Sequence, residues 1–229
     1  METKLIAITN PLIEATSEGR TYSALSPEEF IVYIARVSNP SNQLNTETGS
    51  KLLNYLVKHK HWSPFEHISI TFEIKTSRAI AAQILRHRSF TFQEFSQRYA
   101  EVTEFEDIEW RKQGKTNRQV GDESIVLEDH LKNTVYNLQK LVKSTYDTLV
   151  DNGIAKECAR MILPLNTKTT IYMTGTLRSW IHYLDLRCAV ETQKEHRDIA
   201  LSIAHQLKIQ FPKTFNAIDQ VNNASPYNR

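Results

Sequence analysis

The chain has 229 residues, of which 28 are Lys or Arg and 26 are Asp or Glu, so its formal net charge is only +2. A hydrophobic content of 40% can form a packed core, and the near balance of charges excludes a general electrostatic coat for nucleic acid. Any binding of anions should therefore depend on a local group of cations. We expect neither a targeting sequence nor a membrane span, because no stretch approaches the roughly 20 apolar residues that a bilayer requires.

The first part of the chain predicts two strands separated by helices. Apolar residues at every second position from Ile68 to Ile74 have the period of a strand with one buried face. Ser26 and Pro27, followed by two glutamates, are typical of a helix start. We expect strands at residues 4–9 and 67–76, and helices at residues 26–38, 48–60 and 77–88.

The second part of the chain predicts a long helix and a second strand. The polar run RKQGKTNRQVGDES at residues 111–124 indicates an exposed loop. A long helix should occupy most of residues 125–152 and end at Gly153, which can adopt the left-handed cap conformation. We expect a helix at 154–162 that Pro164 ends, a strand at 167–176, helices at 176–187 and 194–211, and a frayed tail at 222–229.

These elements together predict a single α+β domain over residues 1–229. Its small, mostly antiparallel sheet should be flanked by helices, including the long helix near 125–152. The six glycines form neither a G-x-G-x-x-G fingerprint nor a phosphate-binding loop. A bound nucleotide would therefore have to be held by side chains.

The stretch RHRSFTFQEFSQRY at residues 86–99 concentrates cations beside aromatic rings. Gln83, Arg86 and His87 lie three and four positions apart on the expected helix and therefore share one face. Guanidinium groups bind phosphate oxygens through paired hydrogen bonds, and Phe and Tyr rings can pack against a planar heterocycle. The stretch favours a nucleotide, although a solvated helix end that complements the helix dipole could carry the same basic triplet.

Arg-His-Arg, seven residues, Ser, one residue and then Arg-Tyr resembles the signature of the flavin-dependent thymidylate synthases. In this sequence the signature residues are Arg86, His87, Arg88, Ser96, Arg98 and Tyr99. Further blocks resemble the same family in the same order: ARVS at 35–38, HWSPFEH at 61–67, ARMILPL at 159–165 and LRSWIHYLDLR at 177–187. The resemblance spans roughly residues 30 to 215 and departs from the family pattern at Thr91, Gln93 and Gln97.

The resemblance implies reductive methylation of dUMP to dTMP, with FAD reduced by NADPH and with methylenetetrahydrofolate as the one-carbon donor. It also implies a homotetramer whose sites are shared between subunits. Arg187 is the implied catalytic residue, since its charge would stabilise negative charge that develops on the uracil. The implied dUMP-binding residues are Gln83, Arg86, Glu94, Ser96, Gln97, Arg98, Arg160 and Arg187. The implied FAD-binding residues are Ser38, His61, Arg86, His87, Arg88, Gln93, Glu94, Arg178 and His182.

Two other functions stay open from the residues alone. His59 and His61 form a His-x-His pair that could serve a metal-dependent nucleotide hydrolase, but no third ligand is evident and we assign no metal site. The same arginines and aromatic residues could bind RNA or DNA without a flavin.

The two cysteines, Cys158 and Cys188, bear on both compartment and mechanism. They form no C-x-x-C pair, which argues against a disulfide framework and predicts a reducing compartment such as the cytoplasm. Cys158 lies in an apolar helical pattern and is expected in the core, whereas Cys188 follows Arg187 and is the better candidate for a reactive thiol. Flavin chemistry would require neither.

Overall fold

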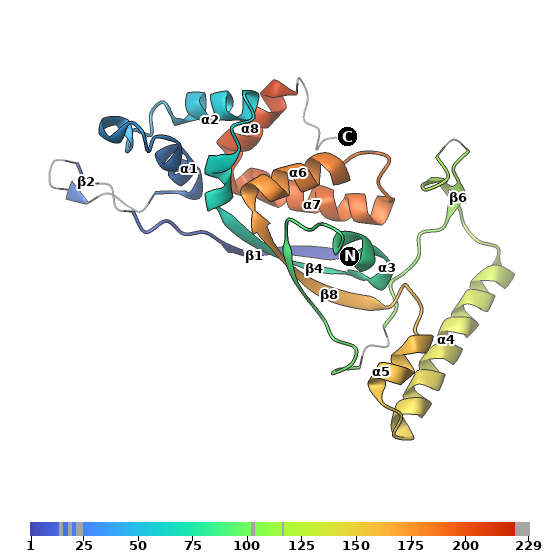
Figure 1. The fold of residues 1–229 in the computed structure, drawn as a ribbon. Helices are drawn as coiled ribbons and strands as arrows, with labels where there is room; N and C mark the ends of the chain where they lie inside the picture. The colour runs from blue at the N-terminus through green and yellow to red at the C-terminus, as the bar shows by residue number, and fades with distance from the viewer. Residues whose placement is uncertain (14–15, 18–19, 22–24, 102–103, 116, 223–229) are drawn as a thin grey trace.

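The computed structural model describes residues 1–13, 16–17, 20–21, 25–101, 104–115 and 117–222. Its central sheet has four strands in the order β1-β4-β8-β5, and each neighbouring pair is antiparallel. The strands are β1 (Glu2–Ile8), β4 (Ser69–Ser77), β8 (Lys168–Thr176) and β5 (Thr91–Glu94). The predicted α+β fold with a small antiparallel sheet is therefore confirmed (Figure 1).

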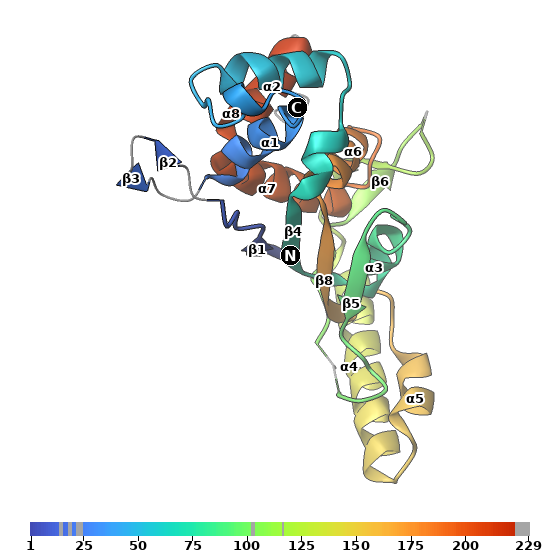
Figure 2. The same cartoon turned by 60° about the vertical axis from the view of Figure 1, so that its left-hand side comes forward.

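The helices form two groups around this sheet. Helices α6 (Leu177–Arg187) and α7 (Lys194–Gln210) lie along one side of it (Figure 1). Figure 2 shows that α1 (Pro27–Ala35), α2 (Gly49–Lys58) and α8 (Pro212–Val221) pack together beyond α7. Of the remaining short helices, α3 (Arg78–Ile84) and η2 (Ser63–His67) contact the sheet, and η1 (Pro40–Asn42) lies between α1 and α2 along the chain. Since α3 and α6 begin directly where β4 and β8 end, the sheet fixes where both helices start.

The buried face of the sheet follows from the alternation seen in the sequence. Ile70, Phe72 and Ile74 of β4 have no exposed surface. Trp180 of α6 packs edge-on against Phe72, with ring centroids 5.1 Å apart, and its indole N–H donates to the carbonyl oxygen of Ile70 at 3.2 Å. The indole therefore keeps a hydrogen bond while its ring covers apolar surface.

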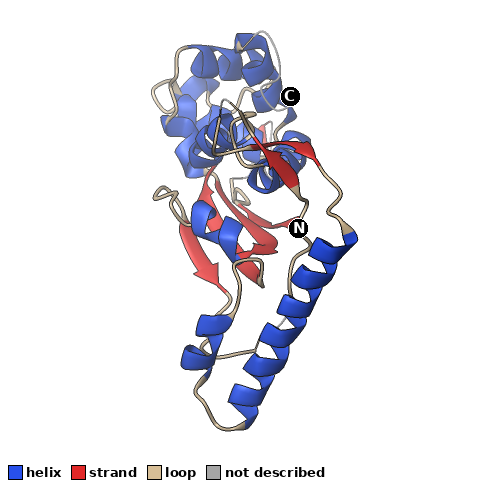
Figure 3. Ribbon diagram, turned by 90° about the vertical axis from the view of Figure 1, so that its right-hand side faces the viewer, coloured by secondary structure: helices blue, strands red, loops and turns tan. Residues whose placement is uncertain are grey.

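The long helix α4 (Asp129–Asp151) and the short helix α5 (Lys156–Ala159) extend away from the sheet, as Figure 3 shows. Tyr146 is the one residue of α4 that is buried in the described structure. Gly153 has φ of +81° just after the helix, which confirms the predicted left-handed position. This helix therefore presents most of its surface outward.

The structure corrects several predicted boundaries. The expected loop at 111–124 contains a hairpin of β6 (Arg111–Gln113) and β7 (Gly121–Ser124). Strands pair through backbone hydrogen bonds, so an exposed hairpin can form without the apolar alternation that would reveal it in the sequence. The helix expected at 77–88 ends at Ile84, before the basic triplet, and the one expected at 154–162 divides into α5 and η3 (Arg160–Ile162). Helix α8 was not predicted.

The remaining features near the ends of the chain are small. A two-stranded sheet joins β2 (Thr16–Ser17) and β3 (Arg20–Thr21). The predicted frayed tail lies outside the described residues beyond Asn222. Within the described ranges, no helix is both long and apolar enough to cross a membrane.

Glu28 of α1 holds the start of α8. Its carboxylate is buried and accepts hydrogen bonds from the backbone N–H groups of Lys213 at 3.2 Å and Thr214 at 2.6 Å. The first N–H groups of a helix have no partner within the helix, and the helix dipole also favours negative charge there. One side chain therefore joins two helices that are 185 residues apart along the chain.

We expect Glu28→Ala to lower the free energy of unfolding by about 2 kcal/mol, because it leaves buried N–H groups without an acceptor. Urea unfolding monitored by circular dichroism measures this change. Glu28→Gln retains one acceptor and should lose less, and the exposed Glu47→Ala serves as a surface control. Equal stability of Glu28→Ala and the wild type would contradict the proposed cap.

Candidate active site

The basic triplet lies in the turn between α3 and β5. Phe90, which follows this turn, is buried and packs on Trp180 with ring centroids 4.7 Å apart. A Cβ on Gly175 of β8 would lie 2.4 Å from the Phe90 ring, so only glycine permits this approach. The anchored ring holds the turn against β8 and α6.

Alternate residues of the turn point to different environments. Arg86 and Arg88 are exposed, whereas His87 is half-buried. Neither arginine has a side-chain partner among the described residues. Two guanidinium groups are therefore free to bind an anion at this turn.

Arg187, the last residue of α6, meets His87. Its Nε donates to Nε2 of His87 at 2.9 Å, which requires a neutral imidazole that carries its proton on Nδ1. Burial, together with the charge of Arg187, lowers the pKa of His87 to about 4. Because the partner of Arg187 is neutral, the positive charge of this guanidinium is not cancelled by a carboxylate.

Gln83 lies beside this pair in a chain of hydrogen bonds. Its Nε2 donates to Oε1 of Gln193 at 2.7 Å, and its Oε1 lies 3.3 Å from Nδ1 of His196. Nε2 of His196 lies 3.0 Å from the hydroxyl of Tyr183. No sequence motif pointed to His196, although a histidine on the apolar face of the helix predicted at 194–211 was a signal that could have indicated it.

Glu94 of β5 is held at another position along the sheet. Its Oε1 accepts hydrogen bonds from Nη1 of Arg78 and Oγ1 of Thr169, both at 3.0 Å. The neighbouring Gln93 is exposed. No local sequence pattern indicated Arg78 or Thr169, because these residues lie 16 and 75 positions away from Glu94 along the chain.

The remaining predicted dUMP residues lie near α5 and η3. Ser96 is exposed, and Arg98 is paired with Glu157 at 3.3 Å. Buried nitrogen atoms of Gln97 (Nε2) and Arg160 (Nε) have no hydrogen-bond partner within the part of the chain that the structure describes. An oxygen atom of a phosphate or ribose could accept a hydrogen bond from each of these N–H groups.

Several predicted FAD residues gather around η2 and α6. Arg178 is paired with Glu66, and His182 packs edge-on against Trp62 with ring centroids 5.4 Å apart. Burial, followed by the charge of Arg178, lowers the pKa of His182. His61 is exposed nearby in the chain.

Ser38 lies apart from these groups. It lines a hollow of about 440 Å³ together with Arg36, Asn42 and Thr48, and none of the other predicted FAD residues lines that hollow. The single chain therefore brings some of the predicted site residues together and leaves others separate.

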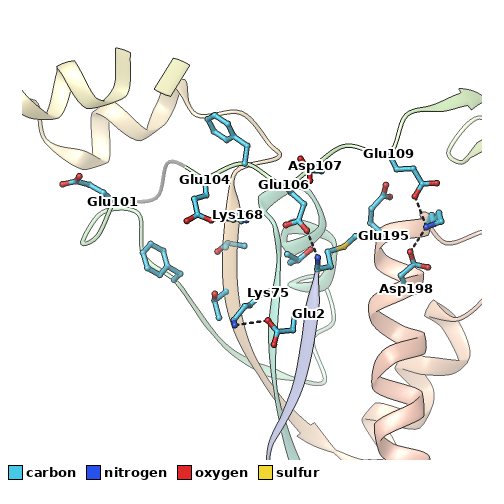
Figure 4. Close-up of a pocket in the computed structure, with 17 residues that line it drawn as sticks. Glu2, Lys75, Glu101, Glu104, Glu106, Asp107, Glu109, Lys168, Glu195 and Asp198 are labelled. Atoms are coloured by element: carbon cyan, nitrogen blue, oxygen red, sulfur yellow. Dashed lines mark hydrogen bonds and ion pairs between the residues drawn. The ribbon is translucent and has the colours of Figure 1, made fainter. Parts of the chain in front are cut away.

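A cavity of about 890 Å³ is lined by β1, the ends of β4 and β8, α7 and residues 104–109 (Figure 4). Most of its charges pair with one another, including the Met1 amine with Glu106 at 2.7 Å and Lys75 with Glu2 at 3.0 Å. None of the predicted dUMP or FAD residues lines this cavity. Its size alone therefore does not identify it as the predicted site.

The cysteines reverse the expected arrangement. Cys158 is exposed, so its predicted core position is wrong; the short helix α5 buries Ala159 instead. Cys188 is buried, and burial, aided by Asp185, raises its pKa to about 12. A buried thiol with this pKa is poorly suited to act as a nucleophilic thiolate.

The His-x-His pair has no further ligands in the described structure. The rings of His59 and His61 lie 6.1 Å apart, and His59 is 4.3 Å from the ring of Tyr55. No cluster of three His, Cys, Asp or Glu residues that could hold a metal ion occurs in the described ranges. The pair therefore carries no argument for a hydrolase.

Comparison with known proteins shows the family of this chain. The family described as "Thymidylate synthase complementing protein" matches residues 21–213. A protein of Paramecium bursaria Chlorella virus 1 named "Probable flavin-dependent thymidylate synthase" is 47% identical over 224 residues, which cover 96% of this chain and all of the relative. The flavin-dependent thymidylate synthase of a Synechocystis species is 45% identical over 223 residues, with the same coverage. The chain therefore belongs to the flavin-dependent thymidylate synthase family.

A solved structure is also similar over nearly the whole chain. It is the UMP/dUMP methylase PolB from Streptomyces cacaoi, bound with 5-Br dUMP. The TM-score is 0.77 at 27% identity, and the match covers 98% of this chain and 97% of PolB. The fold around the candidate site is therefore that of an enzyme that acts on a pyrimidine nucleotide.

We expect the free energy of unfolding to fall as the pH is lowered from about 6.5 towards 4. The unfolded chain takes up a proton on His87 below its ordinary pKa of 6.5, whereas the folded chain does so only near 4. His87 contributes a slope of at most about 1.4 kcal/mol per pH unit in this window, and its contribution to stability is fully present above pH 6.5.

Urea unfolding of the wild type and of His87→Gln between pH 7 and 4.5 tests this expectation. The variant should lose less stability on acidification, because glutamine retains an acceptor for Arg187 but does not titrate. His205→Gln, on the exposed side of α7, is the matched control and should behave as the wild type. An unchanged slope for His87→Gln would show that His87 is not the neutral partner of Arg187.

Proposed function

We propose that this chain forms dTMP from dUMP by reductive methylation, with FAD as bound cofactor, methylenetetrahydrofolate as one-carbon donor and NADPH as reductant. The observation that carries the proposal is the contact of Arg187 with a neutral His87, beside Arg86 and Arg88, whose side chains have no partner among the described residues. The charge of Arg187 therefore lies next to the exposed cations Arg86 and Arg88. An anionic nucleotide needs such cations for its phosphate, and a pyrimidine that develops negative charge needs one beside its ring.

The residues present fit FAD. No glycine-rich loop is available, so the exposed guanidinium groups of Arg86 and Arg88 would bind its pyrophosphate. Arg178, His182 and His61 would hold the remainder, with Ser38, His87, Gln93 and Glu94 completing the assigned set. When bound, FAD would supply the hydride that completes the methyl group.

The dUMP residues have separate tasks. Arg160 and Arg98 would bind phosphate or ribose oxygens, and the unpartnered nitrogen atoms of Arg160 and Gln97 support this role. Arg187 would stabilise negative charge on the uracil as its C5 becomes nucleophilic. The remaining assigned contacts, Gln83, Arg86, Glu94 and Ser96, would orient the nucleotide, and no protein nucleophile is required.

We infer that copies of this chain complete one another's sites in a homotetramer. In one chain, Arg160 and Arg98 near α5 are assigned to the same nucleotide as Arg187 at the end of α6. Helix α4 also exposes a row of apolar residues, Leu131, Leu138 and Leu141, which are 44%, 59% and 63% exposed. A contact between copies would cover this row and would also explain how separate residues serve one ligand.

NADPH, methylenetetrahydrofolate and a cytoplasmic location form the remaining part of the proposal. Both cysteines are free in the structure, in keeping with the reducing compartment predicted from the sequence.

We expect Arg187→Ala to keep FAD but to form dTMP about a hundredfold more slowly, since loss of one preorganised charge removes about 3 kcal/mol of transition-state stabilisation. Flavin absorbance measures FAD occupancy, and chromatography of the nucleotide products measures dTMP. Arg118→Ala, on the exposed turn between β6 and β7, is the matched control.

The same experiment tests the function as a whole. A folded wild type that neither binds FAD nor forms dTMP would overturn the proposal, and binding of single-stranded nucleic acid by such a protein would favour the non-enzymatic alternative. Wild-type dTMP formation by Arg187→Ala would remove Arg187 from the site. Loss of FAD from that variant would place Arg187 with the flavin instead.

For the assembly, we expect light scattering after size exclusion to give a tetramer for the wild type. Leu138→Glu combined with Leu141→Glu should yield smaller species, because charges on an apolar contact oppose association. Asn133→Glu, on the same helix but away from this row, should remain tetrameric. A monomeric wild type with full activity would contradict shared sites.

A further inference from the structure

His196 lies in the first turn of α7 and has no exposed surface. It shares the buried face of that helix with Ile199, Ala200 and Ile203. A buried imidazole loses its hydration and must recover hydrogen bonds from the protein. Both of its ring nitrogens have such partners, and neither is used by the proposed chemistry.

The direction of these hydrogen bonds is set at Glu195. Arg111 donates from Nη2 to one carboxylate oxygen, and Gln193 donates from Nε2 to the other at 2.9 Å. Burial alone would raise the pKa of Glu195, but the hydrogen bonds from Arg111 and Gln193 help to hold it below its ordinary value. An ionised carboxylate only accepts, so Gln193 must turn its NH₂ group to Glu195 and its oxygen to Gln83.

The same reasoning continues to His196. Nε2 of Gln83 donates to Gln193, so Oε1 of Gln83 faces the imidazole. An amide oxygen only accepts, and therefore Nδ1 of His196 carries the proton while Nε2 accepts from the hydroxyl of Tyr183. Once the Glu195 carboxylate is ionised, the donor and acceptor of each hydrogen bond from Glu195 to Tyr183 are determined.

The groups around the imidazole keep it neutral. Burial, followed by the charge of Arg187 and by the neighbouring His87, lowers the pKa of His196 to about 3. The hydroxyl of Tyr183, whose pKa is raised chiefly by burial, remains a donor. At neutral pH a single tautomer of His196 therefore satisfies both neighbours.

We propose that His196 is a positioning residue for dUMP: its Nδ1–H holds the amide oxygen of Gln83 and so directs the remaining N–H of Gln83 to an oxygen of the nucleotide. This inference rests on the proposed function, in which Gln83 binds dUMP. If the Gln83 amide were flipped, its oxygen would face the amide oxygen of Gln193. This orientation is disfavoured, so the N–H of Gln83 stays directed to dUMP. Because the amide is fixed before binding, less rotational freedom is lost when dUMP arrives.

The test is calorimetric titration of dUMP into the FAD-loaded full chain. His196→Leu removes the donor and should weaken dUMP binding about three- to tenfold, the range for one lost neutral hydrogen bond. His196→Asn places an amide N–H near the position of Nδ1 and should restore binding to within about twofold of the wild type. Ile199→Val, one turn further along the same buried face, is the control for altered packing.

A second comparison separates positioning from a purely structural role. In the background of Gln83→Ala, His196→Leu should have no further effect on dUMP affinity, because the amide that it positions is absent. Thermal unfolding of each variant shows that the compared proteins are folded.

Three outcomes would overturn the inference. The first is wild-type dUMP affinity in folded His196→Leu, the second is equal weakening by the Leu and Asn variants, and the third is an undiminished loss in the Gln83→Ala background. A folded, FAD-loaded wild type that does not bind dUMP would instead overturn the proposed function, and this inference with it.

Discussion

The packing of Phe90 on the bare α-carbon of Gly175 determines where the basic triplet lies. A side chain at Gly175 would occupy the space of the Phe90 ring, and β5 pairs with β8 immediately beside this contact, with Thr91 opposite Thr174. The turn before Phe90 is thereby held against α6, the helix that begins two residues after Gly175. A missing side chain on one strand thus allows a histidine from another segment to meet Arg187.

The identity of that partner matters for the charge of Arg187. Two other arginines assigned to the site are paired with carboxylates, Arg178 with Glu66 and Arg98 with Glu157. Arg187 is instead oriented by a neutral imidazole, because burial and the guanidinium itself disfavour protonation of His87. The guanidinium is held in place while its full charge stays available to a ligand. Burial disfavours the charged form of His87, so His87 stays neutral and Arg187 is not paired with an opposite charge.

Much of the architecture could be read from local patterns. The period of two from Ile68 to Ile74 marked β4, and the Ser-Pro-Glu-Glu start marked α1, because both depend on interactions between residues close in the chain. The hairpin at 111–124 was missed since its strands are exposed and lack apolar alternation. Cys158 was misplaced because an apolar helical pattern does not show whether anything packs on the helix, and α5 lies on the part that extends from the sheet.

The residue types of the site, the family resemblance and the order of the main elements follow from spacing along the chain and could be read without coordinates. Which of those residues meet depends on the fold. It joined Gln83 to His196 and His87 to Arg187 across about 100 residues or more, and it left Ser38 in a separate hollow. Contacts of this kind depend on the path of the whole chain through the sheet. They also depend on burial, which sets the protonation of each histidine. A local sequence pattern shows neither the path of the chain nor the burial of a side chain.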